Sequence, residues 1–213
     1  MNSFSQFNLH KNKYIYIIGG GGKTTLMYRL AEYLVGLGKT VVSTTSTNLS
    51  YSLTVDRYPL SVGMPIGKLK SGEHKVFGKD ILHEQDKIKG YDPEELDQIY
   101  ESGVADYVIV EADGSKGRSL KAHAAHEPVL SDKAHLIIVV VGLDCIGQPI
   151  SENTVHRSKL FCERVGKKEG DIITKEDVQA IIYHPEGYLS KTTRNSEVVV
   201  FYVKKTDKSQ FSL

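Results

Sequence analysis

Residues that could bind a polyphosphate lie close to the start of the chain, in the run Gly19-Gly20-Gly21-Gly22-Lys23-Thr24-Thr25. Glycines let the backbone turn sharply, so that several N–H groups can point at one anion. Lys23 would supply a full positive charge for terminal phosphates and Thr24 a hydroxyl for Mg²⁺, with Thr25 as a further phosphate contact. We therefore predict a phosphate-binding loop of the P-loop type, with Lys23 as a catalytic residue.

The residues around this run provide the context that a phosphate-binding loop needs. Residues 14–18 are typical of a buried strand, and apolar residues from Leu26 onward recur with helical spacing. A helix that begins directly after the loop would add its positive dipole at the same point. The standard P-loop spacing requires a glycine where Ile17 stands, so the compact loop is more similar to that of Mur-type amide ligases. A glycine-rich turn with an exposed lysine is the alternative interpretation.

Two carboxylates follow the apolar stretch at residues 107–110. Glu111 and Asp113 are two positions apart, so on a continuing strand both side chains would point to the same face. A carboxylate at this place in P-loop enzymes holds Mg²⁺ directly or through water. We predict that Thr24 and one or both of these carboxylates are metal ligands, with Glu111 also a catalytic candidate. Which carboxylate binds the ion stays open, and a strand-end carboxylate that caps the next turn is the alternative.

Hydroxyl groups cluster at residues 43–47, where a second expected strand ends. Ligands of open α/β sheets bind at the carboxyl ends of the strands. Thr44 and Thr45 are therefore candidates to face Mg²⁺ or the γ-phosphate. Ordinary strand ends followed by a turn explain the same residues equally well.

Basic and histidine side chains follow the two carboxylates. Lys116, Arg118 and Lys121 make this segment locally basic, which suits an anionic substrate or transition state. Solvated loop charges are the alternative for these three residues. His123 and His126 have the spacing of one helical face, but a zinc site needs a third ligand that the sequence does not identify.

Arg157 follows His156 within a helix expected over residues 151–165. A guanidinium there could reach a phosphate, as arginine fingers do, so Arg157 is a further catalytic candidate. A partly exposed helix face carries such a pair more often than a functional site does.

The order of apolar stretches predicts an α/β fold with the three layers of a P-loop NTPase and a mostly parallel central sheet. The main expected strands are residues 14–18, 41–42, 107–110, 136–141 and 198–203. We expect residues 1–12 to form a loose arm and residues 13–213 a single nucleotide-binding domain. Residues 48–90 are expected to be an irregular insertion, with weak strands near 59–62 and 75–77.

Composition limits the classes of function. Lys and Arg number 27 and Asp and Glu 26, a net charge of +1, so no basic excess favours nucleic-acid binding. The apolar runs are much shorter than the roughly 20 residues of a membrane span, and the start lacks the apolar core of a signal peptide. The two cysteines fit neither a disulfide framework nor a zinc pattern. We expect a cytoplasmic protein without a nucleic-acid or membrane partner.

Taken in order, these motifs resemble the YqeC-type family, whose members are described as selenium-dependent hydroxylase accessory proteins or selenium cofactor biosynthesis proteins. The resemblance is carried by the run from Gly19 to Thr25, the hydroxyl cluster, and the stretch Val-Glu-Ala-Asp-Gly-Ser-Lys-Gly-Arg-Ser-Leu-Lys-Ala. It continues through His-Glu-Pro-Val, Val-Gly-Leu-Asp and the Val-His-Arg that ends at Arg157. The Glu-Ala-Asp-Gly-Ser stretch, with its downstream Leu-Lys and His-Glu-Pro, is the most specific part.

This resemblance implies a P-loop nucleotide-binding fold and a role in maturing selenium-dependent molybdenum hydroxylases. The partner would be such a hydroxylase or a cofactor-carrier protein, and the ligands ATP or GTP with Mg²⁺. Family members tend to close with an Asn-Lys-x-Asp-like segment that would read guanine. Here the matching residues are Lys204-Lys205-Thr206-Asp207, with lysine in place of asparagine, so the choice of base stays open.

Three functions fit these features. The first is a nucleotide-dependent accessory protein in which NTP hydrolysis, or phosphoryl or adenylyl transfer, drives a step of cofactor assembly. The second is a nucleotide-gated chaperone or scaffold without significant catalysis. A Mur-like ligase or small-molecule kinase is weaker, because Mur-type ligases carry an additional substrate domain and a chain of 213 residues has little room for one.

Overall fold

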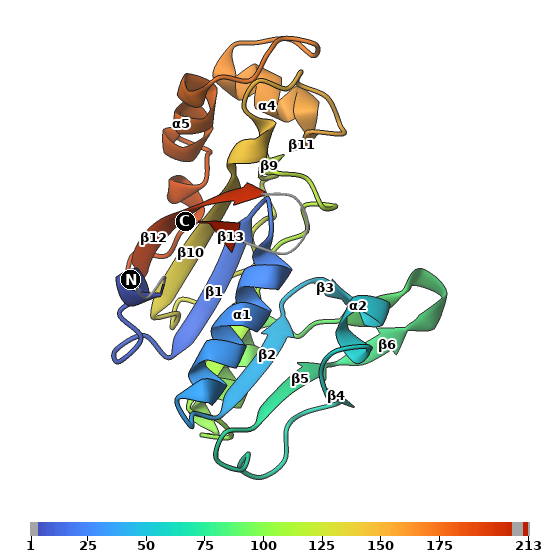
Figure 1. The fold of residues 1–213 in the computed structure, drawn as a ribbon, viewed down its shortest axis with the longest axis vertical. Helices are drawn as coiled ribbons and strands as arrows, with labels where there is room; N and C mark the ends of the chain where they lie inside the picture. The colour runs from blue at the N-terminus through green and yellow to red at the C-terminus, as the bar shows by residue number, and fades with distance from the viewer. Residues whose placement is uncertain (1–3, 206–210, 213) are drawn as a thin grey trace.

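The computed structural model describes residues 4–205 and 211–212, and its centre is one eight-stranded sheet (Figure 1). Its strands are β1 (Tyr14–Gly19), β2 (Val41–Thr45), β4 (Leu60–Val62), β5 (His74–Gly78), β8 (Tyr107–Glu111), β10 (Leu136–Gly142), β12 (Glu197–Lys205) and β13 (Phe211–Ser212). They lie in the order β13-β12-β10-β1-β8-β2-β5-β4. Neighbouring strands run parallel, apart from the antiparallel pair of β12 and β13.

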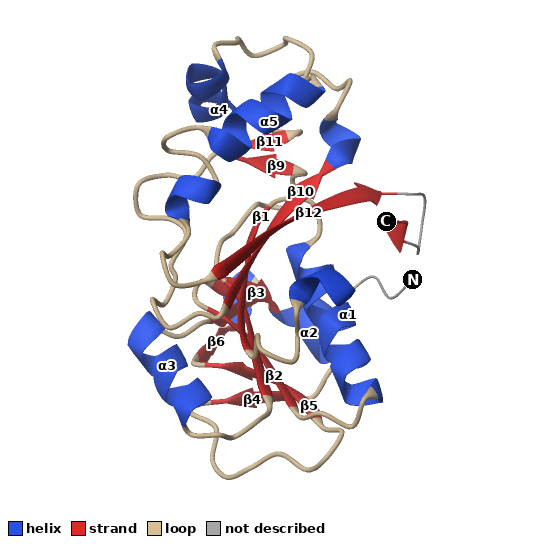
Figure 2. Cartoon of the chain, turned by 90° about the vertical axis from the view of Figure 1, so that its left-hand side faces the viewer, coloured by secondary structure: helices blue, strands red, loops and turns tan. Residues whose placement is uncertain are grey.

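Helices cover both faces of this sheet. α1 (Lys23–Gly36) packs on one face, where its apolar side chains join a cluster with Ile15 and Ile17. The helices on the other face are α3 (Pro93–Glu101), α4 (Ser158–Val165) and α5 (Lys175–Tyr183). Figure 2 shows α1 and α3 on opposite sides of the sheet. The predicted three-layer α/β architecture is therefore confirmed. The continuous apolar strands reflect burial on both faces.

None of the helices in the described part of the chain is long and apolar enough to cross a membrane.

Short elements complete the described part of the chain. A two-stranded parallel sheet pairs β9 (Leu120–Lys121) with β11 (Val155–His156). The 3-10 helices are η1 (Ser5–Phe7), η2 (His83–Gln85), η3 (Leu143–Cys145) and η4 (Leu189–Lys191).

Local sequence fixes the starts of two helices but not of a third. Asp92 and Thr174 cap α3 and α5, each within a capping box, so both helices begin where their polar caps predict. The helix expected over residues 151–165 is wrong in its first half. There β11 pairs with β9, and α4 starts only after this strand ends.

The insertion at residues 48–90 is more ordered than expected. β4 and β5 occupy the two places where weak strands were expected, and they extend the central sheet. The rest forms a small antiparallel sheet in the order β3-β7-β6, with α2 next to it in the chain. These elements are β3 (Asn48–Ser50), α2 (Tyr51–Val55), β6 (Asp80–Leu82) and β7 (Lys87–Lys89).

Residues 4–12 pack against the sheet, so the expected loose arm is wrong for this stretch. Phe7 is fully buried, and its ring centroid lies 5.5 Å from that of Phe201 on β12. The Asn12 side chain donates to the Phe7 carbonyl at 3.0 Å and to the Glu197 carboxylate at 2.7 Å. A few scattered apolar residues are enough to dock the arm on the cluster around α1, although their spacing shows no periodicity in the sequence.

Phe7→Ala tests this packing. Removing a fully buried ring should lower the free energy of unfolding by about 3 kcal/mol, because it leaves a cavity beside Phe201. Leu37→Ala, at an exposed position on the end of α1, is the control and should change it by less than about 0.5 kcal/mol. Urea unfolding of the three proteins measures both effects, and equal stabilities would show that the arm contributes no packing.

Candidate functional site

The glycine loop joins β1 to α1 at the carboxyl edge of the sheet and packs tightly against the end of β10. Gly19 and Gly21 have φ values of +101° and +84°, which side-chain-bearing residues rarely adopt. A Cβ atom at Gly19 would lie 2.2 Å from the Val140 carbonyl oxygen, and one at Gly21 would lie 2.6 Å from the Gly142 Cα atom. Glycine is therefore required at both positions, for its conformation and for the close approach of two backbones.

Three amide groups of the loop already have acceptors within the chain. The N–H of Gly19 donates to the Asp113 carboxylate at 2.9 Å, and that of Gly20 to a β10 carbonyl at 2.9 Å. The N–H of Gly21 donates to the Arg118 carbonyl at 2.8 Å. The chain itself supplies these acceptors, so the prediction that Gly19, Gly20 and Gly21 hold phosphate through their amides requires these contacts to be exchanged.

The first turn of α1 keeps its donors available. Gly22 is the N-cap residue, and because glycine has no side chain it caps none of the helix amides. The amide groups of a first helical turn have no acceptor within the helix. Gly22 and Thr24 are half-buried and Thr25 is exposed, so this turn is open to a ligand. Its amides and positive dipole suit an anion. Among the predicted phosphate contacts, Gly22, Thr24 and Thr25 thus remain candidates.

Lys23 lies between the two predicted carboxylates. Its ammonium group is 3.1 Å from Asp113 Oδ1 and 3.7 Å from Glu111 Oε1, and the side chain is almost fully buried. It also donates to the Gly19 carbonyl at 2.9 Å and to the Ser115 hydroxyl at 3.2 Å. Burial alone would lower the pKa of Lys23, but the two carboxylates outweigh it and raise this pKa, so the side chain stays charged.

Glu111 and Thr24 form the pair that best fits Mg²⁺. The Thr24 hydroxyl donates to Glu111 Oε2 at 2.6 Å, and Glu111 ends β8 facing the start of α1. Burial raises the pKa of Glu111, and this effect exceeds the opposing influence of Lys23 and Thr24. A hydroxyl and a carboxylate oxygen are hard ligands of the kind Mg²⁺ prefers, and the ion commonly takes its other ligands from phosphate and water. Glu111 is therefore the better metal candidate of the two carboxylates.

Asp113 is committed to partners within the chain. It is fully buried, and besides the Gly19 amide its Oδ2 atom accepts a hydrogen bond from His123 Nε2 at 2.5 Å. Oδ1 faces Lys23, and Lys121 Nζ lies 3.7 Å from Oδ2. Burial would raise the pKa of Asp113, but Lys23, His123 and Lys121 hold it well below its usual range. The expected role of Asp113 as a metal ligand does not fit this arrangement, because four donors and cations surround it.

The sequence predicted other roles for two of these partners. Lys121 was a candidate contact for an anionic substrate or transition state, and His123 a candidate zinc ligand. Lys121 is fully buried and donates to the Gly114 carbonyl at 2.6 Å, with Glu127 Oε2 at 2.9 Å. His123 is buried against Asp113, whereas His126 is exposed. The described residues contain no group of three or more His, Cys, Asp or Glu side chains that could hold a metal, so the zinc alternative is not supported. The basic composition of the segment was the only sequence signal for this ion network.

Arg157 contacts Glu127 instead of the glycine loop. It is the N-cap residue of α4, with a left-handed φ of +62°, and does not lie within a helix as expected. Its Nη1 atom pairs with the Glu127 carboxylate, which also binds Lys121. Arg157 therefore stands at the outer end of the chain of ion pairs that begins at Asp113. This position does not support the predicted direct contact with a phosphate.

The two threonines of β2 differ in orientation. The Thr45 hydroxyl donates to the Glu111 carbonyl at 2.6 Å, so it supports the strand end that carries the metal candidate. The Thr44 hydroxyl donates to the Phe77 carbonyl at 2.9 Å. Successive side chains of a strand point to opposite faces, so the two threonines cannot both face α1. Both hydroxyls donate hydrogen bonds to carbonyl groups, so the expectation that they face Mg²⁺ or phosphate does not fit the structure.

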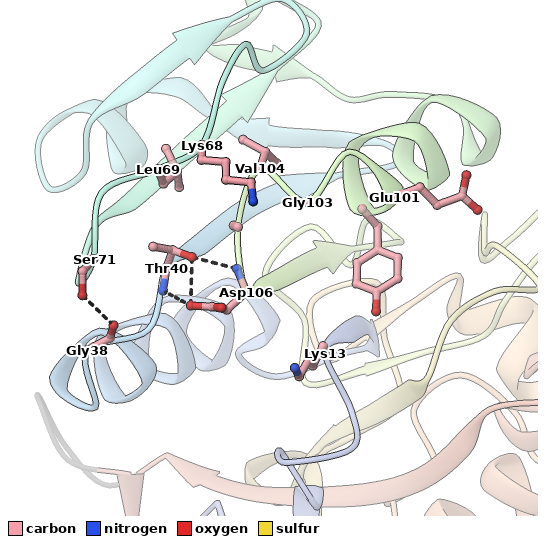
Figure 3. Close-up of a pocket in the computed structure, with 12 residues that line it drawn as sticks. Lys13, Gly38, Thr40, Lys68, Leu69, Ser71, Glu101, Gly103, Val104 and Asp106 are labelled. Atoms are coloured by element: carbon pink, nitrogen blue, oxygen red, sulfur yellow. Dashed lines mark hydrogen bonds between the residues drawn. The ribbon is translucent and has the colours of Figure 1, made fainter.

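A hollow of about 610 Å³ lies at the opposite, amino edge of the sheet (Figure 3). Its polar groups are largely paired with one another, since Asp106 accepts from both the amide and the hydroxyl of Thr40. Its two lysines, Lys13 and Lys68, are exposed. In parallel α/β sheets ligands bind at the carboxyl ends of the strands. We therefore place the candidate site at the glycine loop and not in this hollow.

Comparison with known proteins places the chain in a family. The family model described as YqeC protein matches residues 15–159, which include the glycine loop, both carboxylates and the buried ion network. The chain belongs to the YqeC family. The "Uncharacterized protein YqeC" of Escherichia coli (strain K12) is 30% identical over 192 residues, covering 88% of this chain and 74% of that protein. No solved structure matches the chain.

Asp113→Asn tests whether this carboxylate organises the site of this YqeC family member. Neutralising it would leave Lys23 and Lys121 buried with too little compensating charge, so the free energy of unfolding should fall by about 3 kcal/mol. Asp132→Asn, at an exposed position, is the matched control and should have a small effect. Chemical unfolding followed by circular dichroism measures both, and a near-neutral Asp113→Asn would contradict the proposed role.

The pH dependence of stability tests the contact between His123 and Asp113. Burial lowers the pKa of His123 and outweighs the opposing effect of Asp113, so the unfolded chain binds a proton at this histidine more readily than the folded protein. Stability should therefore fall as the pH drops below about 6.5. His123→Gln keeps a donor to Asp113 but takes up no proton. Between about pH 7.5 and about pH 5.5 the unfolding free energy of the variant should decline less steeply than that of the wild type. Parallel pH curves would refute this assignment.

Proposed function

We propose that the chain binds a nucleoside triphosphate with Mg²⁺ at the first turn of α1. The observation that carries this proposal is the hydrogen bond from the Thr24 hydroxyl to the Glu111 carboxylate, beside the buried Lys23 ammonium. Lys23 and Thr24 directly follow the glycine loop, and Glu111 ends the neighbouring strand β8 at the same carboxyl edge of the parallel sheet, where nucleotides bind in related architectures.

Each group of this turn has a distinct task in the proposal. The amides of residues 22–25 and the Thr25 hydroxyl contact phosphate oxygens, and Lys23 adds a full positive charge. Thr24 and Glu111 hold the metal. Mg²⁺ in such a site neutralises phosphate charge and fixes the geometry of the triphosphate. Glu111 must be ionised to bind it, and its raised pKa therefore predicts weaker metal binding at low pH.

The biological role that we propose is that of an accessory protein in the maturation of selenium-dependent molybdenum hydroxylases. The support is the resemblance in the glycine loop and in the Glu-Ala-Asp-Gly-Ser stretch. NTP hydrolysis, or phosphoryl or adenylyl transfer, would drive a step of cofactor assembly. The segment that would select ATP or GTP begins at Lys204, and Thr206 and Asp207 lie outside the described residues.

A nucleotide-gated scaffold is the second candidate, and one observation favours it. Asp113 is held by the Gly19 amide and His123 through Oδ2 and faces Lys23 through Oδ1, so Glu111 alone of the two strand-end carboxylates contacts the Thr24 hydroxyl. A carboxylate that holds a metal is not free to act as a base. Turnover measured with and without a selenium-dependent hydroxylase separates the candidates, since binding without turnover in either case indicates a scaffold.

Calorimetric titration with Mg–ATP and Mg–GTP tests the proposal directly. The wild-type protein should bind at least one of them in the micromolar range, and removal of Mg²⁺ by EDTA should weaken binding. The absence of binding by either nucleotide, with and without Mg²⁺, would overturn the proposed function.

Thr24→Ala separates the metal contact from the phosphate contacts. The variant should bind the Mg–nucleotide roughly tenfold more weakly, because a ligand to the ion is lost. The affinity for the same nucleotide in EDTA should change little, because the amides and Lys23 remain. Thr193→Ala, at the amino edge of the sheet, is the control and should leave both affinities unchanged. An equal loss with and without Mg²⁺ would show that Thr24 contacts phosphate instead of the metal.

A further inference from the structure

Residues 114–119, which we call the strap, cross over the glycine loop and close it. The Arg118 carbonyl accepts from the Gly21 amide at 2.8 Å, and the Ser115 hydroxyl accepts from Lys23 at 3.2 Å. The backbones are in close contact, because a Cβ atom at Gly20 would lie 2.9 Å from the Arg118 carbonyl oxygen. Oxygen atoms of the strap thus occupy donors that a polyphosphate would otherwise use.

The strap is anchored at its second half and open at its tip. The Ser119 carbonyl accepts from the Gly142 amide at 3.0 Å, and the Ser119 hydroxyl donates to Asp144 Oδ2 at 2.8 Å. The Arg118 guanidinium donates to the Glu152 carbonyl at 2.6 Å. The tip, by contrast, is exposed at Gly114, Lys116 and Gly117.

The backbone of the tip is held in a conformation that costs free energy. Lys116 and Gly117 have φ values of +49° and +74°. A left-handed φ is unfavourable for a residue with a side chain. The hydrogen bonds of the second half, with those from Lys121 to the Gly114 carbonyl and from Lys23 to the Ser115 hydroxyl, therefore hold the tip in place, and weakening any of them should favour an open strap.

We propose that the strap is an intramolecular competitor of the nucleotide, and that phosphate binding at the glycine loop displaces it. The inference rests on the proposed function and adds its regulation. Displacement frees the amide of Gly21 and the hydrogen-bonding position of the Lys23 ammonium group that Ser115 occupies, so that both can contact phosphate oxygens. The measured affinity is then the intrinsic affinity reduced by the fraction of molecules in which the strap is open. A partner that binds the open strap would raise the affinity for nucleotide, because the two equilibria are linked.

Gly117→Ala tests the competition, with Gly103→Ala as a matched control. Both glycines have a left-handed φ, and a Cβ atom at either would meet nothing within 4 Å. The added strain at residue 117 should destabilise the closed strap and tighten Mg–ATP binding by roughly five- to thirtyfold. The same strain at residue 103, on the opposite edge of the sheet, should leave the affinity unchanged.

Hydrogen exchange without any ligand gives a second readout. The Gly142 amide donates to the strap, so it should exchange faster in Gly117→Ala than in the wild type or in Gly103→Ala. Faster exchange with unchanged Mg–ATP affinity would overturn the inference and leave the proposed function standing. If neither the wild type nor either glycine variant binds Mg–ATP or Mg–GTP, the proposed function fails and the inference fails with it.

Arg118→Ala provides an independent way to loosen the strap if Gly117→Ala does not fold. It removes the hydrogen bond to the Glu152 carbonyl and leaves the backbone contacts of residue 118 possible. It should tighten Mg–ATP binding and speed exchange at Gly142, whereas Arg194→Ala, at an exposed position on the amino edge, should do neither. Unchanged affinity and unchanged exchange in Arg118→Ala would contradict the competition.

Discussion

The buried carboxylate of Asp113 is the constraint on which the site depends. A charge removed from water must be paired and hydrogen-bonded, or it destabilises the fold by several kcal/mol. Asp113 satisfies this requirement with the Gly19 amide, the Lys23 ammonium, and His123 and Lys121 from the following segment. The glycine loop, the start of α1 and residues 120–123 are therefore held together by one side chain.

The network around Asp113 is balanced in charge. Its three cations and three carboxylates are Lys23, Lys121, Arg157, Glu111, Asp113 and Glu127. A triphosphate added to a balanced, largely buried network brings an excess of negative charge, which a divalent cation would offset. The need for Mg²⁺ in the proposed function thus follows from the whole network as well as from the Thr24–Glu111 pair.

The close packing of the glycine loop has two opposing effects on ligand binding. Contact with β10 and with the strap fixes the loop in one conformation, which prepares the first turn of α1 for an anion. The same contacts consume the amides of Gly20 and Gly21, and the Asp113 carboxylate accepts from the amide of Gly19. A site that is both ordered and partly closed binds its ligand only after an internal contact is exchanged, so its affinity depends on the stability of that contact.

The sequence by itself determined the main strands of the central sheet and the position of α1. Apolar runs predicted the parallel sheet, and the glycine run followed by apolar residues at helical spacing predicted α1. Parallel topology then required Lys23 to lie near Glu111 and Asp113. Tertiary structure alone decided which carboxylate is engaged by the chain, where Arg157 and Thr44 point, and how residues 4–12 pack. These outcomes depend on contacts such as those of Gly19 with Asp113 and of Thr24 with Glu111, 94 and 87 positions apart in the chain. Periodicity and capping describe only near neighbours in sequence, whereas the pairing of buried charges is settled by whichever distant groups the fold brings within reach.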